Sequence, residues 1–344
     1  MINPIFDFPV FPIPKTRYLN SFELLTKEIK RCLHSNYNDT SIAFSLNPEP
    51  GVEVGVKYFN EATRSSGKSY ICVGDGLTAL RLFLSTNSVQ SFILSYGDLA
   101  THKNYLALRG KTEQAFTKEK PIDIYDLEIA GGLKTQNFTM ETSYNPLKRK
   151  MGGWIVYRNQ KIQLGCRLHT REEFLNKFRN PSTLAIEPLL ALQKIDLVGV
   201  YTSDVFNNLS GSEMPNQYKI SVSALDVLST DGQSRIVGGY LHKVLYYGRA
   251  VTLAGEFERV INQNIHSEPT IPESVLRVGG AWQLSNRSAV KLRVTSNGDV
   301  DLLFGIGTSR TIPAVSVAIG VGFNVRSKLN PNDVRASLSI HLGG

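Results

Sequence analysis

Apolar and polar residues alternate along the last eleven residues of the chain, VRASLSIHLGG. Every second position is apolar, and the positions between are polar. The apolar set is Val334, Ala336, Leu338, Ile340 and Leu342, and the polar set is Arg335, Ser337, Ser339 and His341. Because successive side chains of a β-strand point to opposite faces, this period of two predicts a strand with one apolar and one polar face.

The same period recurs through the C-terminal third of the chain. The stretches VLRVGGAWQLS, AVKLRVT, DVDLLFGIG and AVSVAIGVGFNV each alternate in this way. Between the second and third of them, Asn297-Gly298 predicts a tight hairpin turn, since both residues accept positive φ. The C-terminal third therefore predicts a run of antiparallel hairpins.

A weaker alternation extends upstream, in GVEVGVKYF from Gly51 and AVTLAGEFERV from Ala250. Turn-rich stretches such as NEATRSSGKS and NNLSGSEMPNQ separate the candidates. We count roughly 19 or 20 strand candidates after residue 40, or about 16 residues for each strand and its turn, which suits membrane-length strands of about 10 residues. Residues 40–344 are therefore assigned to one large sheet.

The segment YLNSFELLTKEIKRCL breaks the pattern. Its apolar residues, among them Leu19, Phe22 and Ile29, fall three or four positions apart, which is typical of an amphipathic helix. We expect this helix over residues 18–34. Residues 1–17 are rich in proline and predict an extended arm.

The polar faces of the strands carry ions and small residues, and this bears on the architecture. A soluble sandwich or propeller also has alternating strands, but its polar faces lie in bulk water. A barrel in lipid can instead surround a wet pore with charges such as Glu53, Lys57 and Lys291, and its sheet must close because hydrocarbon offers no hydrogen bonds. We therefore expect an all-β chain that forms a transmembrane antiparallel β-barrel.

Composition and motifs exclude several other classes. No run of 18 apolar residues is present, and the first residues lack the apolar core of a signal peptide. The three cysteines and six histidines are dispersed, so no metal site or cofactor is expected, and no nucleotide-binding or hydrolase motif indicates an enzyme. The formal net charge of +8 is scattered without interleaved aromatic residues, which does not favour nucleic-acid binding.

The segments YLHKVLYYGRAVTLAGEFERVI, VGGAWQLS, KLRVTSNGDVDLLFGIG and VSVAIGVGF resemble the pore-forming subunit of the mitochondrial outer-membrane protein translocase, the TOM complex. The similarity is best over roughly the last hundred residues and suits a diverged, protist-type version with a short N-terminus. Its sister family, the VDAC porin, is more distantly similar. The resemblance implies about 19 strands, with the first and last parallel, and a helix in the lumen that includes Leu19, Phe22 and Ile29.

The resemblance also implies a sorting signal in the last strand. Mitochondrial barrel proteins carry a polar residue, a glycine and two hydrophobic residues at fixed spacing there. Arg335, Ser337, Ile340 and Leu342 match this spacing, except that Ser337 stands where glycine is usual. The signal addresses the chain to the mitochondrial outer membrane. The partners implied are precursor proteins, small helical tail-anchored subunits, receptors, the lipid bilayer and further copies in a dimer or larger oligomer.

A protein-conducting channel is the leading functional hypothesis. Presequences are basic amphipathic helices, so inward-facing carboxylates would attract them with screened, reversible energies. The candidates for this path are Glu53, Asp126, Glu128, Glu256, Glu258 and Asp301, although some of them could instead form ion pairs within the wall. Two alternatives stay open: a VDAC-like voltage-gated metabolite or anion channel, for which Gly-Leu-Lys in AGGLK is a weak signal, and a barrel-type membrane anchor.

Overall fold

The computed structural model describes residues 21–34, 41–49, 52–61, 64–74, 77–85, 89–98, 103–113, 123–170, 192–206, 215–227, 233–247, 249–262, 274–285, 288–307, 314–326 and 334–343. The expected arm over residues 1–17 and Leu19 of the expected helix lie outside these ranges. The described residues form two short helices and 19 strands. The expectation of an antiparallel, nearly all-β chain is confirmed.

The strands follow one another in chain order. The first ten are β1 (Ser41–Glu49), β2 (Val52–Glu61), β3 (Arg64–Gly74), β4 (Thr78–Ser85), β5 (Val89–Asp98), β6 (Lys103–Glu113), β7 (Asp123–Lys134), β8 (Phe138–Asn145), β9 (Lys150–Arg158) and β10 (Ile162–Thr170). The other nine are β11 (Leu192–Phe206), β12 (Pro215–Val227), β13 (Gln233–Tyr246), β14 (Arg249–Asn262), β15 (Ser274–Gln283), β16 (Ser288–Thr295), β17 (Asp299–Gly307), β18 (Ala314–Asn324) and β19 (Arg335–Gly343).

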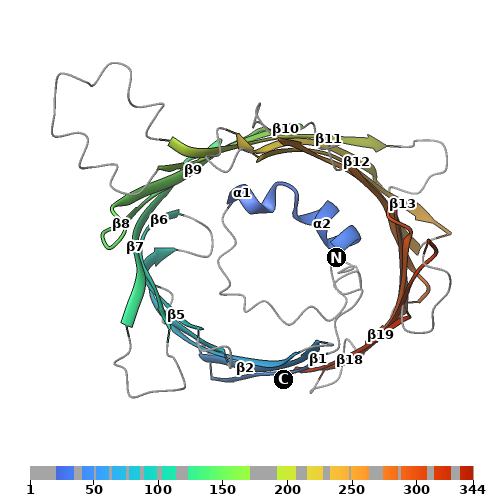
Figure 1. The fold of residues 1–344 in the computed structure, drawn as a ribbon, viewed down its shortest axis with the longest axis horizontal. Coiled ribbons are helices and arrows are strands. Elements are labelled where there is room, and N and C mark those ends of the chain that lie inside the picture. Colours follow the sequence, from blue (N-terminus) through green and yellow to red (C-terminus); the bar gives the residue numbers. More distant parts are fainter. Residues whose placement is uncertain are drawn as a thin grey trace.

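Each of these 19 strands pairs with two others. Strands adjacent in sequence pair antiparallel, and β1 additionally pairs with β19 in parallel, from Ser41 opposite Ser339 to Ser45 opposite Gly343. Viewed end-on, the strands surround a central space that holds both helices (Figure 1). The order of pairing therefore runs in a ring whose seam lies between β1 and β19.

The two faces of the ring differ in chemistry, as the alternation predicts. Large apolar side chains on the outer face are exposed, for example Leu253 at 51% and Phe257 at 45% on β14. Between them, Ala254 and Glu256 face inward and are buried. In the part of the chain that the structure describes, no helix is long and apolar enough to cross a membrane.

The expected single helix is two helices, α1 (Ser21–Leu24) and α2 (Lys27–His34). Leu25 N donates to Phe22 O at 3.3 Å in a tight turn, and Lys30 N then bonds to Thr26 O at 3.1 Å as α2 begins. Glu28 lies in the first turn of α2, where a negative charge suits the helix dipole. Phe22 and Leu25, on either side of the end of α1, both pack against the wall.

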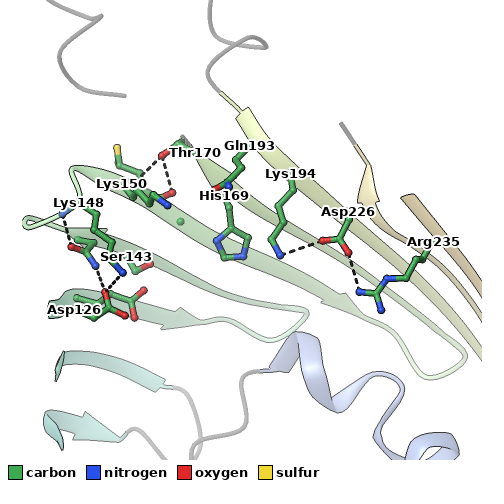
Figure 2. A pocket seen from close by; sticks show the side chains of 14 residues that line it. Asp126, Ser143, Lys148, Lys150, His169, Thr170, Gln193, Lys194, Asp226 and Arg235 are labelled. Atoms are coloured by element: carbon green, nitrogen blue, oxygen red, sulfur yellow. Dashed lines mark hydrogen bonds and ion pairs between the residues drawn. The ribbon is translucent and has the colours of Figure 1, made fainter. Parts of the chain in front are cut away.

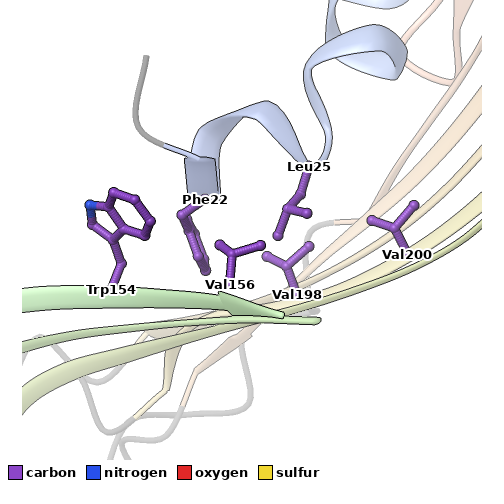
Figure 3. Close-up of a cluster of buried hydrophobic side chains, with 6 residues drawn as sticks. All are labelled: Phe22, Leu25, Trp154, Val156, Val198 and Val200. Atoms are coloured by element: carbon purple, nitrogen blue, oxygen red, sulfur yellow. The ribbon is translucent and has the colours of Figure 1, made fainter. Parts of the chain in front are cut away.

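The helices pack on one side of the ring through apolar side chains. Phe22 and Leu25 point at a patch on β9 and β11 made by Trp154, Val156, Val198 and Val200 (Figure 3). Farther along, Ile29, Cys32 and Leu33 pack on Leu241 of β13 and Ala254 of β14. Phe22 and Ile29 are 5% and 3% exposed. These two residues of the apolar stripe that the sequence predicts therefore lie on the face of the helices that contacts the wall.

The turn at Asn297-Gly298 differs in detail from the expectation. β16 ends at Thr295 and β17 begins at Asp299, so three residues connect them. Gly298 has φ of 90°, and its N–H donates to Thr295 O at 3.0 Å. A three-residue connection that ends in a left-handed glycine is the next most common hairpin after the two-residue turn, and only Gly298 uses positive φ here.

Candidate functional site in the inner wall

The inner face of the ring carries charged side chains of both signs, supplied by many of the strands. Among the described residues, cations outnumber carboxylates on this face. The cations include Arg81, Arg109, Lys111, Lys150, Arg158, Arg167, Lys194, Lys219, Arg235, Lys243, Arg277, Lys291, Arg293 and Arg335, and the carboxylates include Glu53, Asp126, Glu128, Glu141, Asp196, Asp226, Glu256, Glu258, Asp299 and Asp301.

The six carboxylates expected to line a path all lie on this inner face, and each has a partner there. Asp301 is fully buried, with Arg293 Nη2 at 2.5 Å and Arg335 Nη2 at 3.3 Å. Tyr70 Oη donates to Glu53 at 3.0 Å. Asp301 thus follows the alternative named for these carboxylates, an ion pair within the wall.

Glu256 and Glu258 on β14 share one cation. Arg277 Nη1 lies 2.9 Å from Glu256 and 2.8 Å from Glu258. Arg235 approaches Glu258 at 3.8 Å, and His34 Nε2 of α2 lies 2.7 Å from Glu256 Oε1. These two carboxylates are thus part of one network of ion pairs and hydrogen bonds that includes the helix.

Asp126 and Glu128 lie at the start of β7. Asn145 donates to Asp126, and Lys148 and Lys111 lie 3.6 and 3.8 Å from it. Arg109 reaches Glu128 at 3.4 Å. Five of the six carboxylates pair with a cation, whereas Glu53 accepts a hydrogen bond from the neutral hydroxyl of Tyr70. A role for the six in binding a presequence stays a prediction.

Two strongly bonded arginine–carboxylate pairs were not identified from the sequence. Arg109 donates from Nη1 and Nη2 to Glu141 at 3.0 and 2.7 Å, and Tyr105 donates to the same carboxylate. Arg167 donates from Nε and Nη2 to Asp196 at 2.8 and 2.5 Å. Glu141 and Asp196 are 5% and 1% exposed. Partners 29 to 32 residues apart leave no sequence signal, because only the strand register brings them together.

A cavity of about 650 Å³ opens at the end of the inner wall where β7, β9, β11 and β13 begin. Figure 2 shows Asp126 and Lys148 at one side, Lys194, Asp226 and Arg235 in a row at the other, and His169 between them. Asp226 is held by Lys194 at 3.2 Å and Arg235 at 2.9 Å. Positive and negative side chains both line this cavity. Asp126 pairs with Lys148, and Asp226 pairs with Lys194 and Arg235.

Ion pairs attach α2 to the wall in addition to its apolar face. Glu28 accepts from Lys219 at 2.5 Å and from Lys243 at 3.0 Å. At the other end of the helix, Arg293 Nη1 donates to Leu33 O at 2.9 Å, which satisfies a terminal carbonyl. Burial raises the pKa of Glu28, but the hydrogen bond from Lys219 and the charge of Lys243 outweigh it, so the pKa lies below its usual range.

Comparisons with known proteins give no family. No family pattern and no curated protein sequence matches the chain. Among solved structures, the chain is similar to a protein described as outer-membrane expressed OmpT of Vibrio cholerae, with 8% sequence identity and a TM-score of 0.29. The similarity covers 85% of this chain and 89% of the other.

The pKa of Glu28 predicts a pH-dependent attachment of α2. A carboxylate whose pKa is lowered in the folded state stabilises that state above its unfolded pKa, and this contribution is lost as pH falls through the folded value. Because Glu28 is 40% exposed, screening limits the effect to about 0.5–1 kcal/mol. At pH 7, Glu28→Gln should therefore expose Cys32 of α2 to thiol reagents about twofold to fivefold faster.

The measurement uses chains in which Cys72 and Cys166 are replaced, so that only Cys32 reacts. At each pH the labelling rate of the Glu28→Gln variant is divided by that of the chain that keeps Glu28, which cancels the intrinsic pH dependence of the thiol. The ratio should approach one below the folded pKa of Glu28. A ratio of one at pH 7 would show that this ion pair does not hold the helix.

The shared cation makes a second prediction, about stability. Replacing Glu256 and Glu258 with lysine places two cations beside Arg277, which is 17% exposed. Breaking such a buried pair costs about 3–5 kcal/mol, so the double variant should unfold at lower denaturant in detergent micelles. Adding Arg277→Glu should recover a large part of the loss. Equal stability of the double variant and the wild-type chain would contradict the buried pair.

Proposed function

We propose that the chain forms a transmembrane β-barrel channel of the mitochondrial outer membrane and that this channel passes unfolded precursor proteins. The outer face supports the membrane part of the proposal, because its exposed side chains are large and apolar on strand after strand. The inner face holds the charges. A ring with this polarity suits hydrocarbon outside and water inside.

The parallel pairing of β1 with β19 is the observation that carries the proposal. An odd number of strands, each antiparallel to the next, brings the first and last strands together in the same direction. Bacterial single-chain barrels have even numbers of strands, whereas the mitochondrial VDAC has 19. The odd, parallel closure therefore favours the mitochondrial class.

The residues of the expected sorting signal lie at this seam. Ile340 is opposite Ile42 of β1 and Val317 of β18, and Leu342 is opposite Phe44 and Val315. Both alternate with the inward positions of β19, where Ser337 and Ser339 are buried, and so belong to the apolar outer face. A receptor that binds β19 before β1 pairs with it would contact Ile340 and Leu342. The same two residues later lie at the pairing that completes the ring.

Within this proposal, the partners follow from the resemblance of the last hundred residues or so to the translocase pore. They are precursor proteins, small helical tail-anchored subunits, receptors and further copies of the chain in one complex. The paired carboxylates of the wall suit transient contact with a passing chain, because a charge that already has a partner binds a third group weakly.

A double substitution tests the sorting signal. Changing Ile340 and Leu342 to glutamine should leave the chain imported into mitochondria but absent from its native complex on native gels. A matched control changes Leu302 and Phe304, which lie on the outer face of β17 away from the seam. Normal assembly of the seam variant would rule out this signal.

A second candidate function, an anion-preferring metabolite channel, is favoured by the excess of cations over carboxylates on the inner wall. Planar-bilayer recordings of the full chain distinguish the two. A protein channel should be blocked by a basic presequence peptide, more strongly at low salt. Absence of block together with a reversal potential that indicates anion preference would favour the metabolite channel and overturn the first proposal.

A further inference from the structure

Arg81 of β4 differs from the wall arginines that hold a carboxylate, such as Arg167 and Arg293. Its side chain is 4% exposed, and within the described residues its Nε and Nη1 atoms have no hydrogen-bond partner. An arginine keeps its charge in proteins. Burying a charge without a hydrogen-bonded partner is costly, so buried charges are normally paired.

The residues opposite Arg81 cannot neutralise it. Cys72 of β3 and Ile93 of β5 are its register partners. The nearby hydroxyl of Ser95 already donates to the carbonyl of Ala79, at 3.3 Å. Among the described residues, these neighbours of Arg81 are therefore a thiol, an aliphatic chain and an engaged hydroxyl, and none of the three is a carboxylate.

The nearest carboxylates on either side have other partners. In the same register row, Glu53 lies opposite Cys72, two strands from Arg81, and accepts the hydrogen bond of Tyr70. On the other side the row continues to Arg109, a second cation, which holds Glu128 and Glu141. The counter-charge of Arg81 is thus missing from this described part of the wall.

The contrast with other arginines shows what is missing. Arg167, Arg277 and Arg293 each hold a carboxylate oxygen at 2.5 to 2.9 Å. In each case an acidic residue on the neighbouring strand supplies the oxygen. At Arg81 the same fork of N–H donors is in place on the same inner face, and no acidic residue stands opposite.

We propose that Arg81 is an oxyanion-binding site in the wall of the ring. The guanidinium fork matches the planar oxygens of a carboxylate and the oxygens of a phosphate group. The bound oxyanion supplies the charge and the acceptors that the neighbouring strands lack. The site does not depend on which solute the channel passes.

Binding to the folded chain alone makes stability depend on the oxyanion. At a ligand concentration ten times the dissociation constant, the equilibrium constant of unfolding falls about 11-fold. Replacing Arg81 with methionine removes both the site and the buried charge. Without oxyanion this variant should be at least as stable as the wild-type chain, because apolar replacements of buried charges are often neutral or stabilising.

The experiment follows denaturant unfolding of the full chain in detergent micelles. Three sodium salts are compared at equal ionic strength: chloride, inorganic phosphate and acetate. The wild-type midpoint should rise saturably in phosphate, in acetate or in both, relative to chloride, and the salt that raises it identifies the group bound. General salting-out by phosphate is measured in the Arg81→Met chain and subtracted.

Arg249→Met is the matched control, since it removes the same charge from an exposed position at the start of β14. It should keep the wild-type response, whereas Arg81→Met and Arg81→Gln should lose it. An equal response in the Arg81 variants would overturn the proposal. If neither Arg81 variant folds, the wild-type titration decides alone, because a chain with no saturable gain in either oxyanion has no such site.

Discussion

Both edges of every strand need a hydrogen-bonding partner, and the pairing of β1 with β19 supplies the last one. An unpaired strand edge exposes a row of N–H and C=O groups, which water can satisfy but hydrocarbon cannot. Because the described chain has 19 strands that alternate in direction, this last pairing has to be parallel. The pairing also gives the ring an inside and an outside. Because alternate side chains of a strand point to opposite faces, one set faces inward and the other faces outward.

The division into two faces explains where the charges lie and why they pair. Inward positions on neighbouring strands are about 5 Å apart, so an arginine and a carboxylate in adjacent register meet without any loop to position them. Arg293 with Asp301 and Arg167 with Asp196 arise in this way. Each pair limits the electrostatic field that reaches the space inside the ring. Arg81 lacks such a neighbour among the described residues, and its guanidinium is therefore the group that we propose binds an oxyanion.

The helices depend on the same wall. Eight residues of α2 are too few to form a stable helix alone, so its stability comes from the surface on which it packs. That surface combines apolar residues such as Leu241 with the lysines that hold Glu28. Apolar contacts and ion pairs both hold the helix against the wall.

The sequence by itself determined the elements that rest on local periodicity. The strands from Val275 onward, the inward and outward sets along them, and the apolar stripe through Phe22 and Ile29 all follow from the spacing of residues within one segment. The tertiary structure decided the features that depend on register between segments. The break of the helix after Leu24 is one of these features, because the spacing of its apolar residues predicts one continuous helix. The register between strands decides that Arg109 meets Glu141 and that Cys72 and Ile93 lie opposite Arg81. No spacing of residues along the chain encodes this register.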